Sequence, residues 1–515
     1  MIIYDTTLRD GAQSADVRFS VNDKLEILKG LDALGVHFVE LGWPAAGEHE
    51  LEIYKQAMKL NLRTKIVAFG STARKGIKPE HDDNLKAIIA SKARYAQLFG
   101  KTWAVHVEKQ LKATREENLC LIRESIRYLK SQGIKVFFAA EHFFDGYLDN
   151  QSYALSCLRA AAEGGASAII LCDTNGGTLP DCFQKVCEGV GEFCTSNHLV
   201  AELGVHVHND SGCAVANSLL SLNYGFTHIQ GTINGFGERS GNADLCQLLP
   251  ALVIKKKIPL KIELAKLKDI SELVYTLANI RPNKGQPYVG RNAFRHKGGV
   301  HVDGLLKGAS YEHIDPLQVG NRREFILSEL SGKASVIDML QKKGIVTNKN
   351  DPRVDTMLKE IKSMEKRGYG IESLEAEKQL LIERHFGKNE PFFMVKSWRV
   401  SSEDRQGEFS ECVITGAVGG EERQVVSMVK GGPVDALYRA MQKLIAKKYP
   451  SINNVSLINY KVMIAEDMGA ASTVRVFIKF QNSETWATVG VSTNILKASV
   501  EAIEKGFRFH LCSLQ

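Results

Sequence analysis

The sequence lacks paired cysteines, long apolar runs and a signal-like leader. Its ten cysteines are scattered and form no C-x-x-C pair, so neither a zinc ribbon nor a disulfide framework is expected. Reduced thiols in a cytoplasmic protein are the simpler interpretation. No apolar run is long enough to cross a bilayer, and an apolar strand at residues 2–4 leaves no room for a signal peptide.

The sequence also lacks a strong charge of one sign. The net charge is +7 over 515 residues. Basic runs at 255–257 and 447–448 contain no aromatic residues, so they are interpreted as solvated surface first and as help with a polyanionic ligand second. A nucleic-acid partner is therefore not expected. The length exceeds that of one ordinary core, so we expect two or three domains.

A rhythm of strand then helix fills residues 1 to about 255. The predicted strands lie at 2–4, 37–42, 64–70, 95–100, 135–141, 168–173, 204–208 and 228–231. A helix pattern follows each of them, and eight such units are the count of a (β/α)8 barrel. An open doubly wound sheet is the alternative. Such a sheet usually has fewer strands and a glycine-rich dinucleotide loop, which this sequence lacks.

The first strand runs directly into a polar cluster that contains Arg9 and Asp10. In a parallel α/β protein, such residues lie at the carboxyl end of the strands, where the chemistry is kept. A carboxylate there can bind a hard cation, and a guanidinium can stabilise an oxyanion. The alternative is a surface ion pair beside a turn.

Two histidines end the seventh strand. His206 and His208 are two residues apart, so both imidazoles share one face and can meet one metal ion. A satisfied core pair is the alternative. Asn242 is expected to open the final helix and to cap it, and its oxygen could also complete a site with Asp10 and the two histidines. Such a donor set suits Mg, Mn, Zn or Co without choosing between them, and an ion with open positions acts as a Lewis acid.

Two further strand ends carry candidate groups. Glu141 follows an apolar strand, which is the setting of a base with a perturbed pKa; the alternative is a partner for a cation of the site. Thr174 can donate to a substrate carboxylate, or it can cap the next helix.

Three motifs in this order resemble the acyl-CoA-condensing metallo-TIM-barrel family. They are DTTLRDG at 5–11, HVHND at 206–210 and GERSGNA at 237–243. That family contains the synthases of 2-isopropylmalate, homocitrate and citramalate, and hydroxymethylglutaryl-CoA lyase is a relative. The resemblance implies metal ligands at Asp10, His206, His208 and Asn242. It also implies an oxyanion-stabilising, substrate-binding Arg9, a carboxylate-binding Thr174 and a catalytic Glu141.

Residues 256–390 lose the strand-helix rhythm and become helical and highly charged. This segment resembles the helical linker subdomains of the synthases, in which a histidine and a tyrosine reach the active site of the partner chain. The matching residues are His301 and Tyr311. Without the resemblance, His301 would be only a histidine among glycines. This linker, and the lack of a biotinyl-lysine segment, argue against the lyases and carboxytransferases.

The pattern of residues 391–515 predicts a duplicated unit of strand, strand and helix. The strands are predicted at 410–416 and 424–429 in the first unit and at 473–480 and 485–491 in the second. The helices begin with N-terminal signals, a setting that attracts carboxylates. GGPVDA at 431–436 resembles the C-terminal dimerisation and regulatory domain of the synthases. It implies a homodimer and an amino-acid effector near Gly432, within 431–435. A purely structural dimer module is the alternative.

Within the family, FGSTARK at 69–75 and WATVGVS at 486–492 are most similar to the members that use pyruvate. That similarity implies condensation of pyruvate with acetyl-CoA, and isoleucine as the effector. The members that form 2-isopropylmalate, with leucine as effector, are the nearest alternative, followed by those that form homocitrate. A non-catalytic amino-acid-binding regulator with a degenerate barrel is the alternative from another class.

The reaction implied by the resemblance needs a base that removes a proton and a pocket that selects the keto acid. Glu141, directly or as a relay to His301, would take a methyl proton from acetyl-CoA. The enolate would then add to the ketone, and water would cleave the thioester. We predict that Phe69, Leu98 and Phe138 select a small keto acid.

Overall fold

A computed structural model of the 515-residue chain describes residues 1–327, 330–371, 374–387, 391–404, 408–466 and 472–514. The chain forms two compact units: residues 1–294 with 314–322, and residues 295–313 with 323–515. The division into 1–255, 256–390 and 391–515 stays a prediction, and residue 390 at its second boundary lies outside the described residues. Among the described residues, none of the helices is both long enough and apolar enough to span a bilayer.

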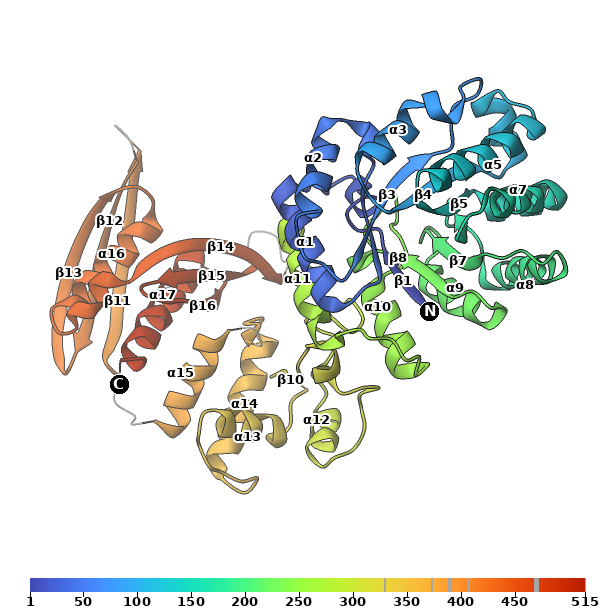
Figure 1. The fold of residues 1–515 in the computed structure, drawn as a ribbon. Coiled ribbons are helices and arrows are strands. Elements are labelled where there is room, and N and C mark those ends of the chain that lie inside the picture. The colour runs from blue at the N-terminus through green and yellow to red at the C-terminus, as the bar shows by residue number, and fades with distance from the viewer. Residues whose placement is uncertain (328–329, 372–373, 388–390, 405–407, 467–471, 515) are drawn as a thin grey trace. The chain divides into compact units, whose positions relative to one another are not determined.

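The first unit contains a closed barrel of eight parallel strands in chain order (Figure 1). This confirms the predicted (β/α)8 architecture. The strands are β1 (Ile2–Asp5), β2 (Phe38–Gly42), β3 (Lys65–Ser71), β4 (Tyr95–Lys101), β5 (Lys135–Glu141), β6 (Ala168–Asp173), β7 (Glu202–Val207) and β8 (His228–Gly231). Strand β1 closes the barrel by pairing with β8, and Ile2 lies in register with His228.

The helices of the first unit surround the strands. The main ones are α1 (Val21–Leu34), α2 (Glu48–Ala57), α3 (Asp83–Ala90), α5 (Arg115–Ser131), α7 (Gln151–Gly164), α8 (Pro180–Ser196), α9 (Ala214–Ser221), α10 (Leu245–Pro250) and α11 (Leu267–Leu277). Local signals set their ends. Ser20 and Asp23 form a capping box at the start of α1, and Gly35 ends that helix with φ +94°, a conformation that favours glycine. Two short helices, α4 (Ala104–His106) and α6 (Phe143–Asp149), follow β4 and β5.

The barrel has two apolar layers. Side chains such as Tyr4, Phe38 and Phe137 fill its interior. A larger core lies between the strands and the helices, and it contains Leu98 and Phe138. The prediction that these two residues select the keto acid is therefore wrong. Successive residues of a strand face opposite sides, so Leu98 and Phe138 point toward the helices.

Within the described residues, the second unit begins with a small two-stranded sheet and four helices. Strands β9 (Arg295–His296) and β10 (Glu324–Phe325) pair in parallel. The helices are α12 (Gly299–Leu306), α13 (Lys333–Lys342), α14 (Pro352–Lys366) and α15 (Glu375–Phe386). Apolar side chains of α13, α14 and α15 share one core with Val489 and Val491 of a later strand. The predicted helical character of this segment is confirmed.

The C-terminal part of the second unit is a duplication, as predicted, but each repeat has three strands before its helix. The first repeat has β11 (Phe393–Asp404), β12 (Glu408–Val418), β13 (Glu421–Lys430) and α16 (Pro433–Ala446). The second has β14 (Ser456–Glu466), β15 (Thr473–Gln481), β16 (Thr485–Ser492) and α17 (Ile495–Cys512). Both sheets are antiparallel. The first strand of each repeat was not predicted, and both of these strands lie at a sheet edge. Of the two, β11 is polar over much of its length, which weakens its strand pattern.

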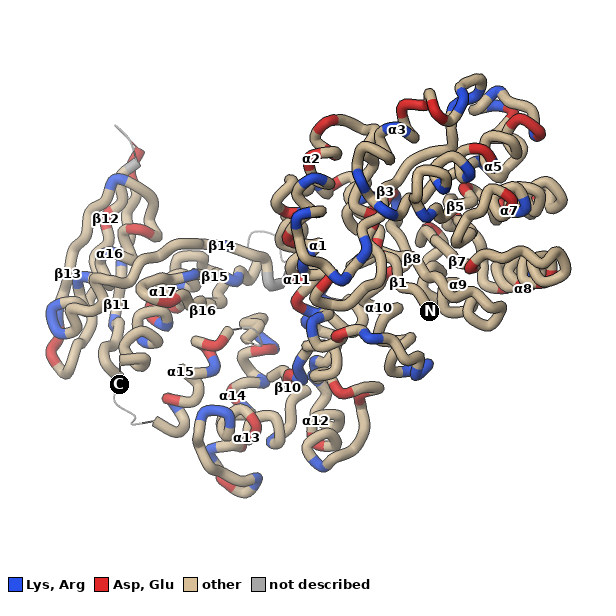
Figure 2. Tube along the Cα trace, viewed as in Figure 1, with Lys and Arg blue, Asp and Glu red and all other residues tan. Residues whose placement is uncertain are grey.

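Charged residues of both signs are interspersed along the described chain. Figure 2 shows Lys and Arg alternating with Asp and Glu over both units. This pattern matches the small net charge of +7. Such a surface favours solubility rather than attraction of one polyanion.

Candidate active site

The turn after β1 is built by its own polar residues. The Asp5 carboxylate accepts hydrogen bonds from the backbone N–H and the hydroxyl of Thr7, at 2.9 and 2.7 Å. The N–H groups of Arg9 and Asp10 both donate to the carbonyl of Thr6, at 3.2 and 2.9 Å. The sequence DTTLRD is thus folded into a tight turn that projects Arg9 and Asp10 at the carboxyl end of the strands.

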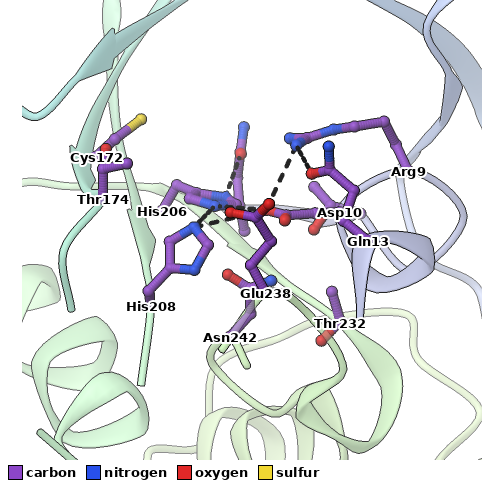
Figure 3. Close-up of polar contacts among 12 residues, drawn as sticks. Arg9, Asp10, Gln13, Cys172, Thr174, His206, His208, Thr232, Glu238 and Asn242 are labelled. Atoms are coloured by element: carbon purple, nitrogen blue, oxygen red, sulfur yellow. Dashed lines mark hydrogen bonds and ion pairs between the residues drawn. The ribbon is translucent and has the colours of Figure 1, made fainter. Parts of the chain in front are cut away.

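Asp10, His206 and His208 meet at this end of the barrel (Figure 3). Oδ2 of Asp10 lies 3.0 Å from Nε2 of His206 and 3.7 Å from Nε2 of His208. The two Nε2 atoms are 3.3 Å apart. All three residues are buried, and they are the one group of potential metal donors of this kind among the described residues. The structure thus brings together three of the four predicted ligands.

The surroundings of this cluster favour a charged Asp10 and a neutral His208. Burial by itself raises the pKa of the Asp10 carboxyl, but the Arg9 guanidinium and His206 outweigh it and hold that pKa well below its usual range. Burial, reinforced by His206, lowers the pKa of His208 to about 3. At neutral pH the cluster therefore presents a carboxylate and an uncharged His208 imidazole.

Asn242, the fourth predicted ligand, lies next to His208. The two residues form an isolated antiparallel β-bridge, and Figure 3 shows the Asn242 side chain below His208 and Glu238. Its Nδ2 donates to the carbonyl of Phe236 at 3.2 Å. Its Oδ1 is buried and has no hydrogen-bond partner among the described residues. An orphaned buried oxygen at this position fits a cation ligand.

The predicted capping role of Asn242 is wrong. The final barrel helix, α10, begins at Leu245, and Asp244 caps it by accepting a hydrogen bond from the N–H of Cys246 at 2.8 Å. The loop from Gly237 to Ala243 runs further before the helix starts than the sequence indicated. The Asn242 side chain is thereby left available to the cluster.

Arg9 is fixed on two sides. Its Nε donates to Oε1 of the buried Glu40 at 2.5 Å, and its guanidinium carbon lies 3.9 Å from the ring centroid of Phe69. Tyr4 donates to the other oxygen of Glu40 at 2.6 Å. The sequence reasoning did not single out Glu40. A carboxylate inside the apolar strand FVELG was the available signal, because a buried charge needs a partner.

The cluster opens into a cavity of about 220 Å³. Aromatic rings form one wall: Phe69 and Phe99 stack with centroids 5.3 Å apart, and Trp43 stands perpendicular to both. Phe69 was predicted to line the pocket and does so, whereas Trp43 and Phe99 were not predicted. The remaining lining residues are Arg9, Asp10, Gln13, Gln97, Ala139, Glu141, Cys172, Thr174, His206, His208 and Glu238.

Glu141 and Thr174, both predicted site residues, line the same cavity. Lys101 Nζ lies 2.5 Å from Oε2 of Glu141, so Glu141 contacts a cation as the alternative interpretation expected. The Thr174 hydroxyl accepts a hydrogen bond from the N–H of His142 at 2.9 Å. Thr174 does not cap the following helix, because α8 begins at Pro180 with Leu179 as its N-cap.

One arginine ties three loops together at the cavity mouth. Arg239 donates to both carboxylate oxygens of Asp210 at 2.9 Å and to the carbonyl of Thr174 at 2.8 Å. Its backbone has φ +55°, which is unusual for a residue other than glycine. Hydrogen bonds from Arg239 therefore connect the loop after β8 to the loops after β6 and β7.

The predicted linker residues His301 and Tyr311 lie in the second unit. Their rings stack with centroids 4.5 Å apart and an interplanar angle of 27°. Both side chains are exposed, and neither is among the residues that line the cavity. Nearby, Glu312 accepts from Arg323 and contacts His296 at 3.0 Å. The chain thus pairs His301 with Tyr311, while their catalytic role stays a prediction.

The two predicted helix N-termini of the C-terminal repeats differ. Gly432 is the N-cap of α16 and has no side chain to occupy the first N–H groups. A Cβ at Gly432 would meet no atom within 4 Å. Asn494, in contrast, caps α17 by accepting from the N–H groups of Leu496 and Lys497. Only the first of these two N-termini therefore lacks a side-chain cap.

Three family models match successive parts of the chain. The model described as HMGL-like matches residues 1–274. The model described as homocitrate synthase post-HMGL domain-like matches residues 288–369. The LeuA allosteric (dimerisation) domain matches residues 372–510.

Curated relatives match almost the whole chain. An (R)-citramalate synthase from Geobacter sulfurreducens is 44% identical over 99% of this chain and 97% of its own length. One from Sulfolobus acidocaldarius is 42% identical over 99% and 96%. A 2-isopropylmalate synthase from Methanocaldococcus jannaschii is 32% identical over 98% and 93%. Because the (R)-citramalate synthases match more closely over the same span, the chain belongs to the (R)-citramalate synthase family.

Proposed function

We propose that the chain condenses acetyl-CoA with pyruvate and water, giving (R)-citramalate and CoA. Membership of the (R)-citramalate synthase family supports this reaction. The observation that carries the proposal is the meeting of Asp10, His206 and His208 beside the Arg9 guanidinium in one small cavity. Metal donors and a fixed cation at the carboxyl end of a barrel suit activation of a keto acid.

The four ligands Asp10, His206, His208 and Asn242 fit a divalent metal ion. Two imidazole Nε2 atoms lie only 3.3 Å apart. When each ring carries its proton on Nδ1, the two Nε2 lone pairs point at one another, and a cation between them removes that repulsion. The orphaned Oδ1 of Asn242 adds a hard donor, and the mixed set accepts Mg, Mn, Zn or Co. When bound, the ion supplies Lewis acidity to oxygen atoms of the keto acid.

Arg9 stabilises the negative charge that develops on the ketone oxygen. Glu40 occupies its Nε and Phe69 packs against its face, so the guanidinium is held in one orientation before substrate binds. A preorganised donor of this kind needs no reorganisation as charge develops. Arg9 therefore acts mainly on the transition state.

Glu141 removes the methyl proton of acetyl-CoA, directly or by relay to His301. The resulting enolate carbon forms a bond to the keto carbon of pyruvate, and the ketone oxygen takes up a proton and becomes the hydroxyl group of the product. Water then cleaves the thioester and releases CoA. The Lys101 ammonium at 2.5 Å keeps Glu141 oriented at the end of β5, within the cavity wall.

Thr174 binds the carboxylate of the keto acid. Its oxygen already accepts the N–H of His142, so the hydroxyl hydrogen is free to donate into the cavity. The carbonyl of the same residue is held by Arg239. The hydroxyl is thereby presented from a fixed backbone.

An apolar wall of the cavity is compatible with pyruvate. The rings of Trp43, Phe69 and Phe99 bound one side of a space of about 220 Å³, and an apolar wall suits the methyl group of this keto acid. Pyruvate carries only that methyl, whereas 2-ketoisovalerate carries an isopropyl group. Discrimination per methylene in an apolar pocket is about 1–3 kcal/mol.

A keto-acid panel tests the reaction. CoA release would be measured with pyruvate, 2-ketoisovalerate and 2-ketoglutarate at equal acetyl-CoA. We expect pyruvate to give the highest kcat/KM. A preference for 2-ketoisovalerate would favour 2-isopropylmalate synthesis, and a preference for 2-ketoglutarate would favour homocitrate synthesis. The absence of CoA release with every acid would favour the non-catalytic regulator.

Metal removal tests the ligand set. After extensive chelation, we expect the metal content and the turnover of the wild-type chain to fall together and to recover when Mn²⁺ or Mg²⁺ is added. Full activity of a metal-free preparation would refute the metal role. His198→Ala, which changes an exposed histidine that does not line the cavity, serves as the control for loss of an imidazole.

The chain works as a homodimer, with His301 and Tyr311 entering the partner's active site. The match to the LeuA allosteric (dimerisation) domain supports dimer formation. The exposed stack of His301 on Tyr311 is suited to completing a site on another chain. The ten cysteines are free thiols, which supports a cytoplasmic location.

Isoleucine is the proposed effector, and leucine is the alternative. The uncapped N-terminus of α16 at Gly432 can accept an amino-acid carboxylate. Gly432 has φ −78° and ψ 167°, a conformation that any residue adopts, so Gly432→Leu is tolerated by the backbone. We expect this variant to lose isoleucine inhibition and to keep uninhibited turnover.

The control for Gly432→Leu is Gly332→Leu. Gly332 is also the N-cap of a helix, α13, and a Cβ there likewise meets no atom within 4 Å. It should retain inhibition. Undiminished isoleucine binding by a chain that lacks residues 391–515 would place the effector site outside the C-terminal repeats.

A further inference from the structure

Beneath the histidine cluster, two glutamines face each other across the barrel interior. Gln97 comes from β4 and Gln230 from β8, and both are buried. Gln230 Nε2 donates to Gln97 Oε1 at 2.6 Å, and Gln97 Nε2 donates to Gln230 Oε1 at 3.2 Å. Each amide therefore satisfies the other, and neither is free to rotate without losing two buried hydrogen bonds.

This amide pair contacts one histidine of the cluster. Oε1 of Gln230 lies 3.1 Å from Nδ1 of His206. In this orientation of the pair, Gln230 presents an acceptor, so His206 must carry its proton on Nδ1. In the neutral ring the lone pair is then on the other nitrogen, Nε2, and it is this atom that lies 3.0 Å from Asp10 Oδ2.

His208 has no such support. Its Nδ1 is buried and has no hydrogen-bond partner among the described residues. The two imidazoles of the cluster are thus held differently, and only the His206 ring is anchored from behind.

We propose that Gln230, held in place by Gln97, is a positioning residue that presents His206 Nε2 as a ligand. By accepting the Nδ1 hydrogen, it fixes both the tautomer and the rotation of the ring, the role that outer-shell acceptors have at metal-bound histidines. This inference rests on the proposed metal site. Gln97 acts one step further out, by fixing which end of the Gln230 amide faces His206.

The test is direct Mn²⁺ binding by the full-length chain, measured by calorimetry and by the electron paramagnetic resonance signal of free Mn²⁺. Gln230→Met keeps the size of the side chain and removes the acceptor. We expect it to bind Mn²⁺ about 10- to 100-fold more weakly than wild type. Gln97→Met keeps the acceptor but frees Gln230 to turn, so a smaller loss is expected.

Gln230→Glu is the conservative rescue. A carboxylate accepts from His206 Nδ1 and also from the Gln97 amide, so its Mn²⁺ affinity should be closer to wild type than that of Gln230→Met. Gln442→Met is the matched control, because Gln442 is a buried glutamine of α16 in the second unit. Circular dichroism of the metal-free proteins checks that each variant is folded.

Two outcomes separate this inference from the proposed metal site. No Mn²⁺ binding by the wild-type chain would overturn both. Wild-type binding that Gln230→Met leaves unchanged would overturn the role of Gln230 alone. Should Gln230→Met not fold, the other two variants decide: tighter binding by Gln230→Glu than by Gln97→Met supports the role, and the reverse order overturns it.

Discussion

The proposed role of Arg9 depends on the planar shape of its guanidinium group as well as on its charge. Its Nε and its ring-stacked face are both occupied, so only the remaining guanidinium nitrogens face the cavity. Lysine supplies the charge but not the planar fork. We expect Arg9→Lys to lower kcat by about 10²- to 10³-fold with a much smaller rise in the pyruvate KM. Steady-state kinetics would check this, and a near wild-type kcat would refute the role.

The aromatic wall predicts a change of selectivity. Phe99→Ala enlarges the cavity without removing the ring beneath Arg9, which belongs to Phe69. We expect kcat/KM for 2-ketoisovalerate relative to pyruvate to rise about 10- to 100-fold. Leu98→Ala is the control, since Leu98 faces the outer core and should alter stability but not selectivity. An unchanged ratio in Phe99→Ala would mean that another wall sets substrate size.

His228 makes barrel stability sensitive to acid. It is fully buried among Tyr4, Phe38 and Phe137, and burial lowers its pKa to about 3. The folded-state pKa lies below the unfolded value of about 6.5. The stability that the neutral ring provides is therefore full above pH 6.5 and is lost as the pH falls toward 3.

His228→Phe should remove this acid sensitivity. Between pH 7.5 and pH 5, the barrel of the variant should lose about 2 kcal/mol less unfolding free energy than the wild-type barrel. Urea unfolding of the full-length chain at both pH values measures the difference. His49→Phe, at an exposed position, should leave it unchanged. Equal losses in the His228→Phe and wild-type chains would contradict the assignment.

At the scale of elements, α15 is joined to the second C-terminal repeat through a buried charge cluster. Lys505 of α17 contacts Glu377 of α15 at 3.1 Å and Glu501 at 3.0 Å. Its ammonium also donates to the carbonyl of Val489 at 2.9 Å. Glu377 in turn accepts the N–H of Val489. The helical segment and the repeat therefore share polar contacts as well as an apolar core.

Removing Lys505 should destabilise this part of the chain. Lys505→Met leaves the Glu377 carboxylate buried without its cation, and such a loss costs about 3–5 kcal/mol of unfolding free energy. Lys497→Met, at an exposed position of the same helix, should change it little. Adding Glu377→Met should restore most of the loss. Chemical unfolding would measure all three, and a small effect of Lys505→Met would contradict the expectation.

The elements that the sequence predicted well have strong periodicity. Apolar strands and amphipathic helices placed all eight barrel units within a few residues, and the His-x-His spacing predicted the meeting of His206 with His208. Single polar residues inside apolar strands were missed, because Glu40, Gln97 and Gln230 acquire meaning only from partners far along the chain. Leu98 was assigned to the pocket although its neighbour Phe99 faces it, since a shift of one residue exchanges the two faces of a strand.

At the scale of the whole molecule, the shared active site predicts complementation. An inactive His301→Ala chain and an inactive Asp10→Ala chain would be mixed under subunit exchange. A heterodimer pairs the intact barrel of one chain with the intact linker of the other, so about a quarter of wild-type activity should return at statistical mixing. No recovery in verified heterodimers would mean that each chain completes its own site.

Because β1 pairs with β8, the barrel can close only late in synthesis of the chain. Ile2 is made early, but its partner His228 and the ligand Asn242 follow more than two hundred residues later. At about 5–20 residues per second, roughly 10–50 seconds separate the appearance of Asp10 from that of Asn242. Throughout that interval one edge of the first strand has no neighbour, and exposed edges invite pairing with other chains. During synthesis, the edge of β1 that pairs with β8 is therefore exposed for longer than the pairing edge of any other barrel strand. The set of metal ligands becomes complete only when the barrel can close.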